Sequence, residues 1–216
     1  MSPIKVCGLT RTQDAIIAAK AGADLLGVVF SGRSPRAIEP AQAASLVASA
    51  RRHAPQTQWI GVFVDAPAER IRHVADAVGL AGVQLHGDET SDTVDRLVRS
   101  GLFVIKALRI GDRADLARID EYSPDAFLLD TYVPGLHGGT GRTFDWSIAR
   151  DAAKTKRIIL SGGLTADNVG VAVELARPWG VDASSGLEDA PGRKNVERLR
   201  AFIAAARRAL TEREPE

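Results

Sequence analysis

The stretch Ile4-Lys5-Val6-Cys7-Gly8-Leu9-Thr10 introduces the pattern on which the chain is built. A short apolar run ends in a turn that begins with glycine, and an alanine-rich amphipathic segment follows at 12–21. Continuous apolar runs of this length are typical of strands covered on both faces, as in a parallel sheet. The stretch therefore predicts a strand that leads directly into a helix.

The same strand-then-helix unit recurs along the whole chain. We expect further strands at 25–30, 59–64, 82–85, 103–108, 126–130, 157–160 and 180–183, and helices at 40–53, 67–78 and 89–100. Eight strands in 216 residues give a repeat of about 27 residues (216/8), which fits a closed (β/α)8 barrel of the α/β class. A doubly wound open sheet is the alternative, but it rarely carries eight such regular units.

Length and composition set the bounds on domain number and partners. The chain suits one substantial core, so we expect a single-domain barrel over residues 1–210 and a polar tail at 211–216. With 28 basic and 27 acidic residues the charges nearly cancel, which argues against a nucleic-acid partner. No apolar run approaches the roughly 20 residues that span a bilayer, and no export signal is recognisable. A single cysteine suits a reducing compartment, so we expect a cytoplasmic protein without a membrane partner.

Cys7 is the first candidate for chemistry. A lone thiol has no partner for an intramolecular disulfide, so Cys7 is either a small core residue or a reactive group. Its position at the carboxyl end of a strand favours the second interpretation, because catalytic side chains of such barrels stand at that edge. Lys5 shares the same strand face and either provides a cation near the thiol or fills the barrel interior.

Asp130 is the second candidate, because it ends the apolar strand Phe127-Leu128-Leu129-Asp130. Packing explains such a carboxylate poorly, since an unpaired buried charge is costly. It either caps the following turn or acts as an acid or base at the barrel mouth, facing Cys7 across a small substrate. The glycine-rich stretch 131–143 that follows predicts a lid over the mouth, with a plain flexible excursion as the alternative.

Two turns rich in glycine and serine follow the last two strands. Loops after strands seven and eight of such barrels frequently bind phosphate through backbone N–H groups. We therefore expect a phosphate site at Gly162, Gly163, Ser184, Ser185 and Gly186.

Arg36 and His86 also follow predicted strands at the same mouth. The guanidinium of Arg36 favours a carboxylate, unless the residue is an isolated surface arginine. His86 is either a structural imidazole or a ligand-binding group. The other histidines show no metal-ligand spacing, so we expect no metal.

Taken together, these segments resemble the phosphoribosylanthranilate isomerase family of tryptophan biosynthesis. The resemblance spans nearly the whole chain in order and rests on Lys5-Val6-Cys7-Gly8-Leu9-Thr10, Ser34-Pro35-Arg36, Gly61-Val62-Phe63-Val64, Val83-Gln84-Leu85-His86-Gly87, Leu128-Leu129-Asp130, Gly138-Gly139-Thr140-Gly141, Ser161-Gly162-Gly163-Leu164 and Asp182-Ala183-Ser184-Ser185-Gly186-Leu187-Glu188. Two departures are Ser161, where the family commonly has Ala, and Ala183, where it often has Val. Neither removes a functional group.

The resemblance implies a role for each candidate residue. Cys7 would be the general base and Asp130 the general acid of an Amadori rearrangement of N-(5-phosphoribosyl)anthranilate. Arg36 would lie near the substrate carboxylate, His86 would contact the substrate, and Asp182 would orient its amine. The phosphorylated substrate would be the partner, no cofactor would be needed, and the chain would be a monomer or a homodimer.

Three other functions remain as alternatives. The sister sugar isomerase of histidine biosynthesis shares the barrel, but it typically uses a pair of aspartates where this chain has Cys7. A Schiff-base aldolase would use Lys106 on the fifth strand as its nucleophile. A non-catalytic phosphate-binding module would leave Cys7 and Asp130 unexplained.

Overall fold

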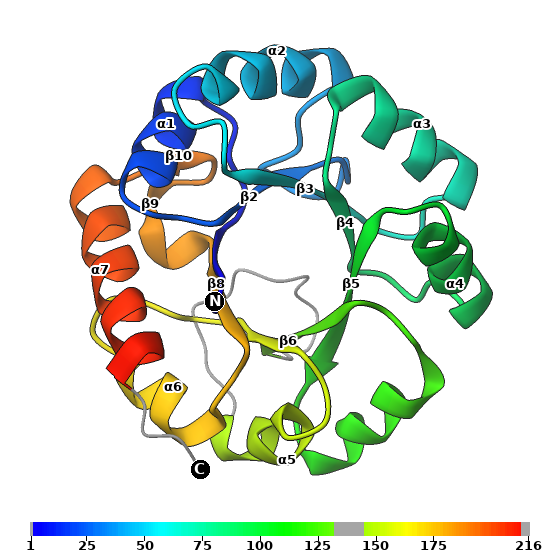
Figure 1. The fold of residues 1–216 in the computed structure, drawn as a ribbon, viewed down its shortest axis with the longest axis vertical. Coiled ribbons are helices and arrows are strands. Elements are labelled where there is room, and N and C mark those ends of the chain that lie inside the picture. Colours follow the sequence, from blue (N-terminus) through cyan, green and yellow to red (C-terminus); the bar gives the residue numbers. More distant parts are fainter. Residues whose placement is uncertain (1, 132–144, 213–216) are drawn as a thin grey trace.

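The computed structural model describes residues 2–131 and 145–212, and its centre is a closed barrel of eight parallel strands (Figure 1). Each strand pairs with the next along the chain, and β1 pairs with β8 to close the barrel. The strands are β1 (Ile4–Val6), β2 (Leu25–Val29), β3 (Gln58–Phe63), β4 (Gly82–Leu85), β5 (Phe103–Ile110), β6 (Ala126–Thr131), β7 (Ile158–Leu160) and β8 (Gly180–Ala183). The predicted barrel is confirmed, and the open sheet is wrong.

Helices form a ring around the strands (Figure 1). They are α1 (Thr12–Lys20), α2 (Pro40–Arg51), α3 (Ala68–Val78), α4 (Ser91–Arg99), α5 (Ala149–Ala153), α6 (Val169–Ala176) and α7 (Val196–Glu212). A 3-10 helix, η1 (Arg113–Glu121), takes the place of an α-helix between β5 and β6, and two short 3-10 turns are η2 (Trp146–Ile148) and η3 (Ser185–Leu187). The last helix continues two residues into the predicted polar tail, and residues 213–216 lie outside the described part of the chain.

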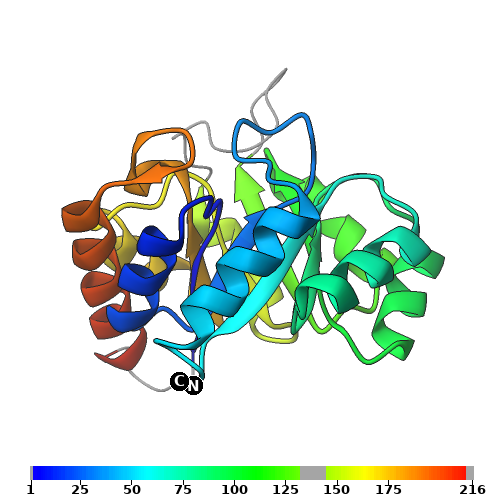
Figure 2. The same ribbon diagram turned by 90° about the horizontal axis from the view of Figure 1, so that it is seen from above.

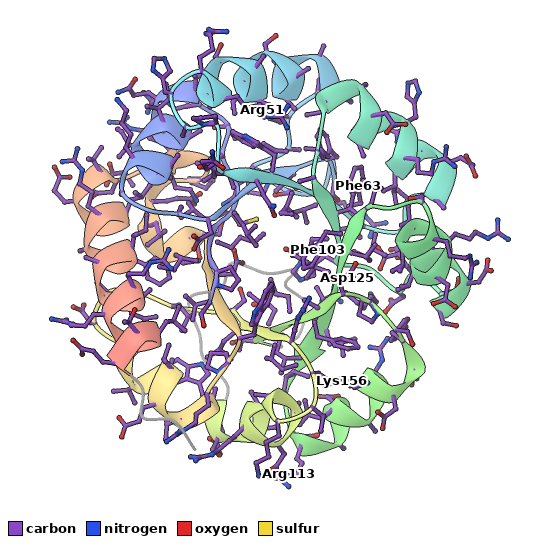
Figure 3. All side chains as sticks on the ribbon, viewed as in Figure 1. Arg51, Phe63, Phe103, Arg113, Asp125 and Lys156 are labelled. Atoms are coloured by element: carbon purple, nitrogen blue, oxygen red, sulfur yellow. The ribbon has the colours of Figure 1, made fainter. Side chains whose placement is uncertain are left out.

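The core has two layers, as the strand pattern requires. One layer packs between the strands and the helices, and the other fills the barrel interior. The interior layer consists of Leu25, Ile60, Ile105, Ala107, Ala126, Leu128 and Ile159. Figure 3 shows side chains converging on the barrel centre, with Phe103 toward the interior and Arg113 at the periphery. Because both strand faces are buried, the strands read as continuous apolar runs.

The eight barrel strands run parallel, so their carboxyl ends share one end of the barrel. The loop that follows β2 projects at this end, as does a small hairpin of β9 (Glu188–Ala190) and β10 (Arg193–Lys194) (Figure 2). The sequence did not predict this hairpin. No helix in the described part of the chain is long and apolar enough to cross a membrane.

Candidate active site

A cavity lies at the carboxyl ends of the strands and brings together all of the predicted site residues. Its lining includes Cys7, Arg36, His86, Asp130, Gly162, Gly163, Asp182, Ser184, Ser185 and Gly186. The apolar part of the wall comes from three valines and Leu164. Residues from all eight barrel strands or their following loops therefore converge on one small volume, as the barrel topology predicts.

Cys7 is buried at the base of this cavity, with 8% of its surface exposed. Its backbone N–H donates to the carbonyl of Ala183 at 3.0 Å, which continues the β1–β8 ladder one residue beyond β1. The thiol lies against Gly27 of the neighbouring strand, where a Cβ atom would come within 2.8 Å of Sγ. Val29 and Val62 complete its apolar surroundings. The sulfur is thus fixed at the edge of the cavity by tight packing.

Lys5 precedes Cys7 by two residues, lies deeper in the barrel and is fully buried. Its Nζ donates to Oδ1 of Asp182 at 3.0 Å, and Ser161 donates its hydroxyl to Oδ2 of the same carboxylate at 3.1 Å. Burial alone would lower the pKa of Lys5, but Asp182 and the negative charge of an ionised Cys7 outweigh it and raise that pKa. Lys5 therefore fills the interior and also holds a positive charge near the thiol.

Asp130 ends up in two contacts, one for each carboxylate oxygen. Oδ1 accepts the backbone N–H of the adjacent Thr131 at 3.0 Å, a contact within β6, and the following turn that Asp130 was expected to cap lies outside the described residues. Oδ2 lies 3.4 Å from Nε2 of His86. Gln84 donates from Nε2 to Nδ1 of His86 at 2.9 Å, which leaves the proton of the neutral ring on the nitrogen that faces Asp130. Nε2 nevertheless makes no hydrogen bond within the described residues, so Oδ2 of Asp130 is free to interact with a ligand in the cavity.

Arg36 is held by a carboxylate that the sequence did not single out. Its Nε lies 2.9 Å from Oε1 of Glu188, and its Nη2 lies 2.7 Å from Oε2. Lys194 approaches the same Oε1 at 2.8 Å. Burial alone would raise the pKa of Glu188, but the hydrogen bonds from Arg36 and the charge of Lys194 outweigh it and lower that pKa. Glu188 is thus an anion between two cations.

The two turns predicted to bind phosphate bring backbone close to the cavity. Gly162 and Gly163 have φ angles of 88° and 67°, which favour glycine. A Cβ on Gly162 would come within 2.2 Å of the hydroxyl oxygen of Thr131. On the other turn, Ser184 donates its hydroxyl to the carbonyl of Cys7 at 3.1 Å. That hydroxyl therefore ties the eighth loop to the first.

Six further polar residues in the lining were not among the predicted site residues: Ser31, Arg33, Ser34, Gln84, Arg109 and Ser161. Arg109 donates from Nη2 to the carbonyl of His86 at 3.4 Å, and its buried Nε has no partner within the described residues. Arg109 follows the inward-facing Ala107 by two positions, so extending the fifth strand beyond residue 108 would have found it.

Lys106 does not line the cavity. It is fully buried, with its Nζ bonded to Glu89 at 2.8 Å and to the carbonyl of Gly87 at 2.7 Å. No group of side chains suited to a metal ion occurs within residues 2–131 and 145–212. The predicted lid at 131–143 falls almost entirely outside the described residues.

Comparisons with known proteins identify the family. The family model for N-(5'phosphoribosyl)anthranilate (PRA) isomerase matches residues 4–205. An N-(5'-phosphoribosyl)anthranilate isomerase from Pelobacter propionicus is 48% identical over 212 residues, which cover 98% of this chain and 99% of the relative.

Solved structures agree with this match. Phosphoribosyl anthranilate isomerase from Thermotoga maritima superposes with a TM-score of 0.87 at 36% identity, covering 96% of this chain and 99% of the other. A phosphoribosyl anthranilate isomerase in complex with reduced 1-(o-carboxyphenylamino)-1-deoxyribulose 5-phosphate gives a TM-score of 0.83 at 34% identity, with the same coverage. The chain belongs to the N-(5′-phosphoribosyl)anthranilate isomerase family.

Proposed function

We propose that this chain converts N-(5′-phosphoribosyl)anthranilate into 1-(2-carboxyphenylamino)-1-deoxy-D-ribulose 5-phosphate in tryptophan biosynthesis. The observation that carries the proposal is the single cavity shared by Cys7, Asp130, Arg36 and the two glycine–serine turns. Family membership over residues 4–205 supports the same reaction. The substrate has two anionic groups, a phosphate and a carboxylate, and the cavity has a distinct kind of donor for each.

Binding is assigned to the two ends of the substrate. We assign the phosphate to backbone N–H groups at Gly162, Gly163 and the Ser184-Ser185-Gly186 turn. Arg36 binds the anthranilate carboxylate, since a guanidinium pairs with a planar carboxylate through two parallel hydrogen bonds. The ribose then lies between these anchors, within reach of both proton-transfer groups.

The chemistry needs two proton transfers. Asp130 in its protonated form gives a proton to the furanose ring oxygen, and the C1′–O bond breaks to leave an iminium ion. The iminium acidifies the hydrogen on C2′, which the Cys7 thiolate removes to give an enolamine. The enolamine then tautomerises to the ketone: C1′ gains the proton held by Cys7, and the C2′ hydroxyl gives its proton to Asp130. Both groups thus return to their starting states, and the substrate and product have the same atoms.

The surrounding residues support each step. Lys5 holds a positive charge beside the thiol of Cys7, which the reaction uses as its base. His86 places Nε2 at 3.4 Å from Oδ2 of Asp130, and this nitrogen makes no hydrogen bond within the described residues. Asp182, held by Lys5 and Ser161, is positioned to accept a hydrogen bond from the substrate amine.

The reaction is a rearrangement driven by acid–base catalysis with no net oxidation or reduction, so its chemistry requires neither a redox cofactor nor a metal. The partner that we propose is the small phosphorylated substrate, and we expect the protein to act in the cytoplasm. The aldolase alternative has less support, because Lys106 is buried in an ion pair with Glu89 outside the cavity lining.

Loss of anthranilate fluorescence tests the proposal on substrate generated in situ. We expect the wild-type chain to turn over phosphoribosylanthranilate, and we expect Cys7→Ala and Asp130→Asn each to reduce kcat by roughly 10²–10⁴-fold. Circular dichroism should show both variants folded. A wild-type chain that binds the reduced product analogue without turnover would indicate a binding module, and near-normal rates in both variants would remove the residue assignment.

A further inference from the structure

Arg36 is the residue assigned to the substrate carboxylate, and the described structure pairs it with Glu188. We propose that Glu188 is a positioning residue that orients Arg36 for carboxylate recognition, and that Lys194 supplies the excess positive charge which the substrate carboxylate neutralises. This inference rests on the proposed function and deepens it. It concerns the recognition of one substrate group by residues that do not touch the reacting atoms.

The hydrogen bonds define which edge of the guanidinium Glu188 uses. Nε of Arg36 contacts both carboxylate oxygens of Glu188, at 2.9 and 3.1 Å, and Nη2 contacts Oε2 at 2.7 Å. A guanidinium has five N–H donors in one plane, so this edge consumes the Nε–H and one N–H of Nη2. Nη1 makes no hydrogen bond within the described part of the chain. The Nη1–Nη2 edge therefore remains for a second planar carboxylate.

The stem of Arg36 is also held in place. A Cβ atom on Gly8 would lie 2.5 Å from Cδ of Arg36, so the stem packs directly on the backbone that follows Cys7. The backbone N–H of Arg36 donates to the hydroxyl of Ser34 at 3.2 Å. Only 14% of the side chain is exposed. The guanidinium therefore has little freedom before any ligand arrives.

The ion pair with Glu188 does not remove the positive charge that would bind the substrate carboxylate, because Lys194 adds a second cation. Lys194 donates from Nζ to Oε1 of Glu188 at 2.8 Å and to the carbonyl of Ser184 at 3.1 Å. Arg36 and Lys194 together contribute two positive charges, and Glu188 contributes one negative charge. These three residues therefore carry one net positive charge. It matches the single negative charge of the anthranilate carboxylate.

The arrangement lowers the cost of binding. An arginine that is already oriented loses little side-chain entropy when the ligand binds, whereas a free one must be ordered at that moment. Removing Glu188 would leave the guanidinium without its fixed edge, so that it would have to be ordered by the substrate. The loss of binding affinity should therefore affect only ligands that carry the carboxylate.

The test compares two inhibitors on Glu188→Gln and wild type. One is the reduced product analogue, and the other is its phenylamino counterpart without the carboxyl group. We expect Glu188→Gln to weaken the carboxylated inhibitor and raise KM by about 10–100-fold, which corresponds to the hydrogen bonds of a charged group, with kcat changed less than about threefold. The inhibitor without the carboxyl group should bind both proteins equally.

Asp24→Asn is the matched control. Asp24 forms an ion pair with Arg207 at 2.7 Å outside the cavity, so it tests the loss of a paired carboxylate as such. We expect it to leave both inhibition constants and KM unchanged. If Glu188→Gln keeps the preference of wild type for the carboxylated inhibitor, the proposal is overturned, whereas a wild-type chain with no turnover contradicts the proposed function instead.

Lys194→Met provides a second variant if Glu188→Gln does not fold. It keeps the Arg36–Glu188 pair and removes the excess positive charge. We expect at least about fivefold weaker binding of the carboxylated inhibitor, in line with the value of close charge pairs at binding sites, and no change for the other. Equal weakening of both inhibitors, or of neither, would contradict the charge argument.

Discussion

Glu188 is the residue at which burial and charge compete most directly. Its side chain is only 4% exposed, which by itself would raise its pKa, yet the hydrogen bonds from Arg36 and the charge of Lys194 lower that pKa below the ordinary 4.5. A carboxyl group whose pKa is lower in the folded state stabilises that state above its unfolded pKa. The contribution is lost as the pH falls through the folded pKa.

This sign predicts how stability depends on pH. At neutral pH, Glu188→Gln should be less stable than wild type, because Arg36 and Lys194 lose their shared anion. As the pH falls below the ordinary glutamate pKa of 4.5 and through the lower pKa of Glu188 in the folded state, wild type should lose the same contribution by protonation. The gap between the two urea midpoints should therefore narrow. The other carboxyl groups affect both proteins alike. A gap that stays constant over this range would mean that Glu188 is not an ionised partner of the two cations.

Single residues also show how far sequence reasoning reaches. Cys7 and Asp130 were predictable because the end of a strand fixes the place of a side chain in a barrel. The ion pair of Glu188 with Arg36 was not predictable, because the two residues lie 152 positions apart in the sequence and only the folded loops bring them together. The catalytic roles assigned to Cys7 and Asp130 remain predictions, which the kinetic tests above address.

At the scale of elements, β2 is shaped to make room for the side chain of a neighbouring strand. Gly27 pairs across β2 and β3 with Ile60, and its carbonyl accepts the N–H of Leu9 at 2.9 Å. Its missing Cβ is what admits Cys7, since that atom would lie 2.8 Å from Sγ and 3.1 Å from Cα. The position of the thiol thus depends on an element other than its own.

Gly27→Ala tests this dependence. The added methyl group must displace the Cys7 backbone as well as the sulfur, so we expect a loss of about 1–3 kcal/mol in the free energy of unfolding. A misplaced base should also lower kcat by at least about tenfold. Gly170→Ala is the matched control on α6, where a Cβ would meet no atom within 4 Å. Its free energy of unfolding should rise by about 0.5–1 kcal/mol, and its kcat should equal that of wild type. Equal kcat in the two variants would contradict the steric argument.

Elements differ in how well the sequence predicts them. The strands were predicted to within about two residues, because both of their faces are buried and each reads as an apolar run. The β9–β10 hairpin was missed, since its residues Glu188, Arg193 and Lys194 are charged and carry no strand pattern. Of these, Glu188 forms an ion pair with Arg36, and Lys194 forms an ion pair with Glu188. Apolar runs therefore do not reveal a strand whose side chains form ion pairs.

The two ends of the barrel have different roles, one in substrate binding and the other in stability. Every lining residue assigned to substrate lies at the carboxyl ends of the strands, whereas the amino ends hold the two ends of the described chain together. At that second end, Arg207 of α7 donates to the carbonyls of Ser2 and Gly22 at 3.1 and 2.8 Å. It also forms an ion pair with Asp24, whose carboxylate accepts the N–H of Ile4 at 2.7 Å.

Arg207→Ala should therefore affect stability without affecting catalysis. The variant loses three hydrogen bonds that join the last helix to the first strands (Figure 1), but Arg207 and Asp24 are about 30% exposed, so solvent offsets part of the loss. We expect a cost of about 1–2 kcal/mol, which lowers the melting temperature by roughly 2–8 °C in a chain of this size. At 25 °C, kcat/KM should equal that of wild type. A fall in kcat/KM with an unchanged melting temperature would show that the two ends are coupled, because a local loss at the amino ends would then have reached Cys7 and Asp130 through the strands.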